Sequence, residues 1–401
     1  MKLIRREVYS NRIRPFIGKG LIKVLTGQRR VGKSCILQQL AEDIRHEQED
    51  ANIVFINMEY AEYHSLKEAE VMTAYIERNL HNGSNYLFID EVQEINGFEQ
   101  VLRSVQAKEQ ADIFVTGSNA RMLSGELATY LSGRYMEFHV NSLSYEEFLE
   151  FHGLKDEDNS LQLYLKYGGM PYLANLSLTD DLVYEYLRNV YSTILLKDVV
   201  AREGIRNVDF LDTLVMYTAD NVGSLFSANN ISRYLKSQQV NISPLAVINY
   251  LRALANAFVI NKVERMDVAG LRKFELRDKY YFEDLGLRNC KLMANLSKDI
   301  GKLLENAVFI HLKFLGYMVY TGQDGNKEID FVAIRNGKKV YVQVAYLIAD
   351  DKTREREFGN LIAIADNYPK YVVSLDPMIL NPNVDGINYL HIRTFLKLHQ
   401  L

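Results

Sequence analysis

The sequence predicts an α/β protein whose first 150 residues form a parallel β-sheet with helical crossovers. Three observations support this fold class. Short apolar runs, typical of buried strands, alternate with stretches of helical periodicity. A glycine-rich segment at residues 27–34 joins the first run to the first helix. Polar side chains follow later runs, at the strand ends where open parallel sheets bind ligands.

The expected strands of this sheet are short and apolar, and they lie at residues 21–26, 52–57, 85–90, 112–116 and 134–140. Helical patterns separate them, at residues 35–44, up to about residue 80, and at 94–106 and 122–132. Because strand and helix alternate throughout, we expect a parallel sheet that is covered by helices on both faces.

Three further parts are expected after the first domain at residues 1–150. Residues 151–205 predict a helical linker or lid, in which Gly-Gly-Met-Pro at 168–171 stops one helix. Three helices and a two-stranded hairpin at 206–286 indicate a winged helix. Residues 287–401 predict a small α/β domain. A chain of 401 residues is long enough for two to four domains.

Composition excludes several protein classes. With 48% hydrophobic residues, 24% charged residues and a net charge of -4, the chain is typical of soluble proteins and has no overall bias toward nucleic acid. Its two cysteines are too few for a disulfide framework. No apolar run approaches the ~20 residues that span a bilayer, so we expect no membrane association and a cytoplasmic location.

Residues 27–34 follow the pattern G-x-x-x-x-G-K-S, with an expected strand before and a helix after. Gly27 and Gly32 let successive backbone N–H groups face one concavity that binds phosphate. Lys33 can reach the β- and γ-phosphates, and the Ser34 hydroxyl is placed to bind Mg²⁺. The alternative is a glycine-rich turn with a surface lysine. The residues expected to contact ATP are Gly27, Gln28, Arg29, Arg30, Val31, Gly32, Lys33, Ser34 and Cys35.

Two adjacent carboxylates end the expected strand at 85–90. Asp90 would hold Mg²⁺, directly or through water, and Glu91 would polarise the attacking water as general base. Kinases that transfer phosphate to a hydroxyl group do not place a base there, so the pair favours hydrolysis.

Two further polar residues are candidates for contacts with phosphate. Asn119 follows the strand at 112–116 and would sense the γ-phosphate, or it serves only a turn. Arg134 stands before the last strand and could reach phosphate in its own or an adjacent subunit of a homo-oligomer, or it caps a surface turn.

These residues resemble a large prokaryotic family of AAA-type ATPases related to the STAND group. The shared motifs are residues 27–34 (GQRRVGKS), 88–93 (FIDEVQ), 116–119 (TGSN), 131–134 (LSGR), 168–171 (GGMP), 281–288 (YFEDLGLR), 304–306 (LEN) and 328–331 (EIDF). The resemblance covers nearly the whole chain. It implies an ASCE-type ATPase core, a winged-helix insert and a C-terminal restriction-endonuclease-like module of the PD-(D/E)xK type.

That nuclease motif is incomplete in this chain. Glu305, Asp330 and Gln343 fall on its positions, but its lysine falls on Ala345. Gln343 removes a charge from the metal site and Ala345 removes the group that activates water, so we expect no DNA cleavage. Lys327 is the candidate for a lysine that has moved.

The sequence therefore predicts a Mg-dependent ATPase that uses its nucleotide state to move or dock its C-terminal modules. The third helix of the winged helix carries only Arg252 as a base in its interior, so both a DNA partner and a protein partner stay open. Two alternatives to this function remain, an ATP-regulated nuclease and a nucleotide switch that binds a partner with little hydrolysis.

Overall fold

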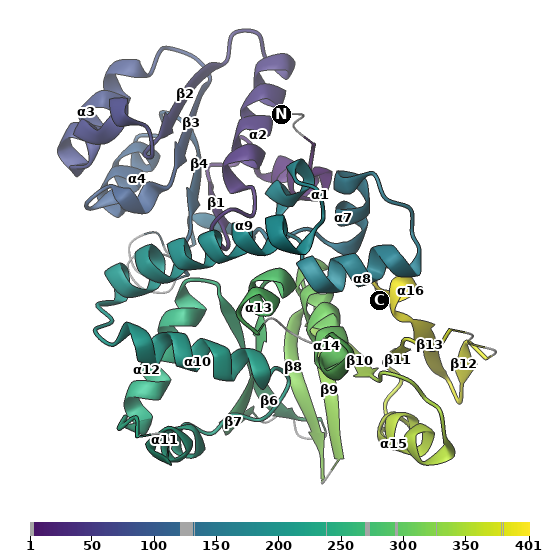
Figure 1. Cartoon of the computed structure of the whole chain (residues 1–401). Coiled ribbons are helices and arrows are strands. Elements are labelled where there is room, and N and C mark those ends of the chain that lie inside the picture. Colours follow the sequence, from purple (N-terminus) through teal and green to yellow (C-terminus); the bar gives the residue numbers. More distant parts are fainter. Residues whose placement is uncertain are drawn as a thin grey trace. The chain divides into compact units, whose positions relative to one another are not determined.

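The chain forms two compact units in a computed structural model (Figure 1). The first comprises Met1–Val140 with Asn256–Phe258, and the second comprises Asn141–Ala255 with Val259–Leu401. The structure describes residues 4–120, 131, 133–237, 239–268, 273–292, 296–325, 327–377, 379 and 381–401. The helix predicted at residues 122–132 lies outside the described residues, apart from Leu131.

A five-stranded parallel sheet forms the centre of the first unit, as predicted. Its strands are β1 (Ile22–Thr26), β2 (Asn52–Asn57), β3 (Asn85–Asp90), β4 (Asp112–Gly117) and β5 (Tyr135–His139). Their spatial order is β2-β3-β4-β1-β5, so β1 lies between β4 and β5. Since all neighbouring strands run parallel, Thr26, Asp90 and Gly117 end at one edge of the sheet.

Helices follow the strands in the first unit. They are α1 (Glu7–Ile13), α2 (Lys33–Glu47), α3 (Ala69–Asn79) and α4 (Phe98–Ala107), with 3₁₀ turns η1 (Arg14–Phe16), η2 (Ala61–Leu66) and η3 (Val92–Glu94). The single helix expected at 94–106 is split into η3 and α4, because Gly97 takes a φ of 71° between them.

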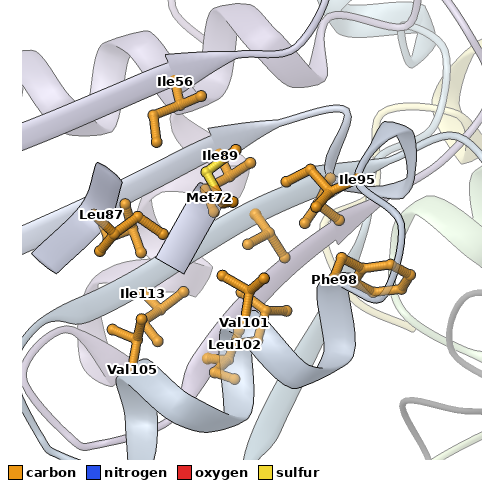
Figure 2. Packing of buried hydrophobic residues seen from close by; sticks show 14 of the residues in the cluster. Ile56, Met72, Leu87, Ile89, Ile95, Phe98, Val101, Leu102, Val105 and Ile113 are labelled. Carbon is orange, nitrogen blue, oxygen red and sulfur yellow. The ribbon is translucent and has the colours of Figure 1, made fainter. Parts of the chain in front are cut away.

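Side chains along each strand point alternately to the two faces of this sheet, so apolar side chains cover both faces. Figure 2 shows Ile56, Leu87, Ile89 and Ile113 of the strands gathered with side chains of α3 and α4, including Met72, Val101, Leu102 and Val105. The intervening residues Phe55, Phe88 and Phe114 stack on one another, with centroids 5.8 Å and 4.5 Å apart. Because neighbouring residues of a strand point to opposite faces, these rings lie on the other face.

The second unit contains an eight-stranded sheet of order β12-β13-β11-β10-β9-β8-β6-β7. Its strands are β6 (Ile260–Asp267), β7 (Lys273–Phe282), β8 (Met318–Asp324), β9 (Lys327–Arg335), β10 (Lys338–Val344), β11 (Lys370–Ser374), β12 (Asn383–Val384) and β13 (Ile387–His391). The antiparallel hairpin β6/β7 pairs with β8 through the parallel contact of β6. The hairpin expected in the winged helix and the C-terminal strands therefore form one sheet.

Helices precede and flank this second sheet. They are α7 (Tyr145–His152), α8 (Asp158–Tyr167), α9 (Asp180–Thr193), α10 (Val208–Asp220), α11 (Ala228–Ser237), α12 (Pro244–Asn256), α13 (Leu285–Leu292), α14 (Leu296–Phe314), α15 (Asp351–Ile362) and α16 (Ile392–Phe395), with the turn η4 (Pro171–Asn175) and the π-helix η5 (Ile194–Ala201). α13 packs against α8, α9 and α10. Apart from residues 256–258, all three parts expected after residue 150 thus lie within one compact unit. Among the described helices, none combines the length and the apolarity of a membrane span.

Candidate functional site

Two glycines allow the loop between β1 and α2 to take backbone conformations that other residues rarely adopt. Gly27 takes a φ of 137°, and a Cβ there would lie 2.2 Å from the carbonyl oxygen of Val140. Gly32 takes a φ of 96° at the N-cap of α2. A side chain at Gly27 would therefore force the loop apart.

Lys33 holds its charge inside this loop. Its Nζ donates to the carbonyl oxygens of Gly27 and Gln28, each at 2.9 Å. The first N–H of α2 to bond back is that of Ile36, which donates to Gly32 O at 3.1 Å. The N–H groups of Lys33, Ser34 and Cys35 precede that bond, at the positive end of the helix. Ammonium and helix end thus present positive charge at one place, as phosphate binding requires.

Asp90 lies beside the loop at the end of β3. It is 1% exposed, and Thr116 and Asn57 both donate hydrogen bonds to its carboxylate, the latter at 3.1 Å. Burial raises the pKa of Asp90, while the side chains of Thr116 and Ser34 oppose that rise. The two expected Mg²⁺ ligands, Ser34 and Asp90, are thus close enough for the Ser34 side chain to oppose the rise in the pKa of Asp90.

Glu91 is held in an unusual conformation next to Asp90. Its φ is 56°, in the left-handed region that non-glycine residues seldom adopt. The Glu91 N–H donates to Thr116 Oγ1 at 2.8 Å, and its carboxylate accepts from the Gln93 amide and, at 3.3 Å, from the Ser118 hydroxyl. Backbone strain of this kind collects at functional sites, where neighbouring contacts maintain it.

Among the other predicted residues, Asn119 lies next to Ser118 at the same sheet edge and is buried. Arg134 does not join them. It is exposed and precedes β5, whose first residue Tyr135 pairs with Ile22 at the start of β1. It therefore lies at the opposite edge, roughly 17 Å away along the strand at about 3.3 Å per residue. A contact between Arg134 and phosphate therefore stays a prediction, and this separation favours the phosphate of an adjacent subunit over that of its own.

The remaining loop residues use their side chains for other contacts. The Gln28 amide donates to Phe258 O at 2.8 Å, and Arg29 lies 3.2 Å from Glu59. Arg30 takes a φ of 72°, and Val31 is buried. Burial raises the pKa of the Cys35 thiol. These residues are suited to contact a ligand through the backbone.

Sequence reasoning missed Asn57 as a member of this site. The residue ends β2, pairs with Asp90 across the sheet and donates to its carboxylate. The sequence feature that could have identified Asn57 is the one that identified Asn119, a polar residue at the end of an apolar run. Parallel strands place all such residues at one edge, so strand ends alone could have identified it.

A second cluster of charges lies in the second unit, around the expected nuclease positions. The Asp330 N–H donates to Gln343 Oε1 at 3.3 Å, and the Val344 N–H donates to Asp330 Oδ2 at 2.8 Å. Glu305 accepts a hydrogen bond from Tyr281. The structure thus brings Glu305, Asp330 and Gln343 to one region. Because Asp330 is buried and the Glu305 charge lies near it, the pKa of Asp330 is raised.

The lysine in this cluster comes from an unexpected strand. Lys279 of β7 is 2% exposed, and its Nζ lies 2.7 Å from Glu328 and 3.4 Å from Glu305. Burial works against its charge, but the carboxylates of Glu305, Asp330 and Glu328 outweigh burial and raise the pKa of Lys279. Lys327 instead donates to Gly359 O at 3.3 Å.

This charged cluster is crowded. Gly223 lies so close that a Cβ there would be 2.7 Å from Glu305 Oε2. Within the described part of the chain, no three His, Cys, Asp or Glu side chains are arranged to hold a metal ion. The ammonium of Lys279 is the cation that these carboxylates contact.

Comparison with known proteins identifies the parts of the chain. Residues 19–149 match the family described as "AAA domain", and residues 158–298 match "Domain of unknown function (DUF8612)". Among solved structures, the Aeropyrum pernix ORC1 protein in complex with DNA is 11% identical, with a TM-score of 0.32 over 74% of this chain and 94% of that chain. AMPPCP-bound DnaA from Aquifex aeolicus is 14% identical, with a TM-score of 0.31 over 61% of this chain and 85% of that one.

Relatives of similar length are found in a bacterium and an archaeon. "Uncharacterized protein MJ1544" of Methanocaldococcus jannaschii is 28% identical over 354 residues, which are 84% of this chain and 77% of that protein. An "Uncharacterized protein" of Haemophilus influenzae is 33% identical over 402 residues, 98% of each chain. The chain therefore has an AAA domain with a P-loop in its first unit, and it belongs to the family of the Haemophilus influenzae protein.

Proposed function

We propose that this protein binds ATP with Mg²⁺, hydrolyses it, and uses its nucleotide state to control the docking of its second unit to a partner. The observation that carries the proposal is the convergence of Lys33, Ser34, Asp90 and Glu91 at one sheet edge. A glycine-rich turn with a surface lysine would not bury that lysine, and Lys33 is 4% exposed.

The residues at this edge fit a magnesium ion. Mg²⁺ prefers oxygen ligands and is bound in such sites by a hydroxyl and one or two carboxylates together with substrate phosphates. Ser34 and Asp90 supply those oxygens, and the Ser34 side chain is close enough to oppose the rise that burial causes in the pKa of Asp90. When bound, the ion would neutralise charge on the β- and γ-phosphates. Lys33 would add its ammonium to the same phosphates.

Glu91 is the residue placed to act on water. Its carboxylate is oriented by Gln93 and Ser118, and its backbone by Thr116. In this role the carboxylate would accept a proton from the attacking water as the water oxygen bonds to the γ-phosphorus, while the bond from that phosphorus to the β–γ bridging oxygen breaks and ADP leaves. Asn119, at the end of the neighbouring strand, would contact the γ-phosphate. Both roles fit hydrolysis better than transfer to a second substrate.

Arg134 is proposed to act on the nucleotide of an adjacent subunit. Its own loop is out of reach, while its exposed position beside Gly18, Gln106 and Asp112 leaves it on the surface of the unit. An arginine supplied from a neighbouring molecule stabilises the charge of the transition state. The proposal therefore includes a homo-oligomer.

A protein partner is favoured over DNA by the surface of α12. This third helix exposes Leu245 and Ile248 at 67% and 43%, on the same side as Arg252. A helix that reads DNA carries several basic or amide side chains toward the groove, whereas apolar exposure is typical of protein contacts. The nuclease alternative is disfavoured by the salt bridges of Lys279. The switch without hydrolysis remains the second candidate, since it needs the same phosphate loop.

Nucleotide binding is the direct test of the phosphate site. Lys33→Ala should weaken binding of a fluorescent ATP analogue by roughly 30-fold or more, because it removes charged hydrogen bonds to phosphate. Lys19→Ala is the matched control, since Lys19 is an exposed lysine of the same unit and should bind like the parent. Equal affinity of the Lys33→Ala variant and the parent would contradict the assignment.

A further inference from the structure

A three-residue segment belongs to the first unit although its neighbours on both sides belong to the second. Residues 256–258 begin with Asn256, the last residue of α12, and precede β6, which begins at Ile260. We call residues 256–258 the connector. It is covalently continuous with an exposed helix on one side and with the hairpin of the large sheet on the other. A shift of the connector would therefore move the ends of both α12 and β6.

The connector contacts two parts of the nucleotide site. Phe258 O accepts from the Gln28 amide at 2.8 Å, and Gln28 O in turn accepts from Lys33 Nζ. Asn256 O accepts at 2.8 Å from the N–H of Ala120, the residue that follows Asn119. One hydrogen bond thus leads to the phosphate lysine, and the other leads to the proposed γ-phosphate sensor.

The connector is held in place at an energetic cost. Phe258 takes a φ of 55°, which is rare for an aromatic residue and strains the backbone. Its ring is 8% exposed and lies 5.0 Å from that of His139 at the end of β5. Gln28 is fully buried, and no described residue bonds to its Oε1. A buried amide that is only half satisfied, beside a strained aromatic residue, is poorly explained by stability alone.

We infer that the connector is a positioning element of the nucleotide site, which reports occupancy of the phosphate loop to α12 and β6. The inference rests on the proposed binding of ATP. A phosphate group that draws Lys33 away from the carbonyl of Gln28 would shift Gln28, and the Gln28 side chain is bonded to Phe258 O. A γ-phosphate that contacts Asn119 would shift Ala120, whose N–H is bonded to Asn256 O. Both effects converge on three residues.

Hydrogen exchange in the full-length protein tests this inference. The parent is compared with and without a saturating non-hydrolysable ATP analogue and Mg²⁺, and deuterium uptake is followed in peptides of α12 and β6. We expect uptake in these peptides to change upon binding. If the analogue binds and these peptides do not respond, the connector's role is wrong while ATP binding stands. If the analogue does not bind, the proposed function itself fails.

Matched variants then locate the path. Gln28→Leu removes the bond to Phe258 O and should reduce the response of α12 and β6 by roughly threefold or more at saturating analogue. Gln39→Leu is the control, since Gln39 is also buried, also donates one bond to a backbone carbonyl, that of Ile4, and also has an unsatisfied Oε1. It should keep the full response.

Phe258→Gly provides a second measurement that leaves every phosphate-loop residue intact. It relieves the positive φ and deletes the ring at His139, so the connector gains freedom and the response should fall as well. This variant decides the case if Gln28→Leu no longer binds the analogue. A full response in Phe258→Gly, or an equal loss in Gln39→Leu and Gln28→Leu, would overturn the inference.

Discussion

At the residue scale, Asp90 and Glu91 are neighbours in sequence with different surroundings. Asp90 receives hydrogen bonds from side chains of two neighbouring strands, and the Ser34 side chain of the phosphate loop opposes the rise that burial causes in its pKa. Glu91 turns into a left-handed conformation, and Ser118 and Gln93 hold its carboxylate. The turn between them separates the proposed metal ligand from the proposed base. Two adjacent carboxylates could not take these two roles on a regular strand, where their side chains would point to opposite faces.

His311 in α14 gives a prediction on pH dependence. Burial lowers the pKa of His311 to about 4, from an ordinary value of 6.5, so the folded protein keeps this ring neutral. The unfolded chain binds the proton more tightly, and stability must fall as pH decreases from about 6.5 toward about 4. The ring packs against Phe314 and Phe395, so phenylalanine can replace it.

We expect His311→Phe to lessen acid destabilisation by about 2 kcal/mol between about pH 7 and about pH 5. Urea unfolding at the two pH values measures it. His399→Phe serves as the control, because the His399 side chain is 77% exposed and its replacement should leave the pH dependence unchanged. If His311→Phe loses as much stability as the parent over this range, the buried neutral ring is not the cause.

At the scale of elements, β7 supplies the cation of the second charged cluster. Lys279→Met leaves the partly exposed carboxylates of Glu305 and Glu328 without their partner and should lower the free energy of unfolding by about 2 kcal/mol. The double variant Lys279→Met with Glu305→Gln should recover part of that loss, since it removes one unpaired charge. Lys327→Met is the control at an exposed lysine and should stay within about 0.5 kcal/mol of the parent. Urea unfolding that shows equal losses for Lys279→Met and Lys327→Met would contradict the account.

These elements also show what a sequence can and cannot predict. The strands β1 to β5 and the residues at their ends were predicted, because apolar runs and the residues that end them are local signals. The arrival of Lys279 at Glu305 was not, since it depends on how β7 and α14 pack together. Lys327, the candidate that sequence closeness to Asp330 suggested, instead donates to Gly359 O. Pairing of β6 with β8 is also non-local, so the hairpin's place in the larger sheet was missed.

At the scale of the whole molecule, the position of Arg134 predicts that activity requires more than one copy of the chain. Arg134→Ala and Lys33→Ala should each lower ATP turnover by roughly a thousandfold or more when measured alone. The first keeps a complete phosphate loop, and the second keeps its arginine. Mixed oligomers of the two variants pair an intact loop with an intact arginine, so part of the turnover should return.

Turnover as a function of the mixing ratio measures this complementation. Two controls should stay inactive. One is Arg134→Ala alone, and the other is Lys33→Ala mixed with the double variant Lys33→Ala, Arg134→Ala. If the mixture remains as inactive as its components, Arg134 does not contribute to the nucleotide site of a neighbouring subunit. If Arg134→Ala lowers the melting temperature together with turnover, Arg134 instead stabilises the turn.

Single-turnover hydrolysis by Glu91→Gln tests whether the edge formed by Lys33, Ser34, Asp90 and Glu91 hydrolyses ATP. The substitution keeps the size of the side chain and removes only its ability to accept a proton. We predict that the variant binds ATP as the parent does and hydrolyses it roughly a hundredfold more slowly or worse. Hydrolysis by Glu91→Gln at the parent's rate would contradict the claim.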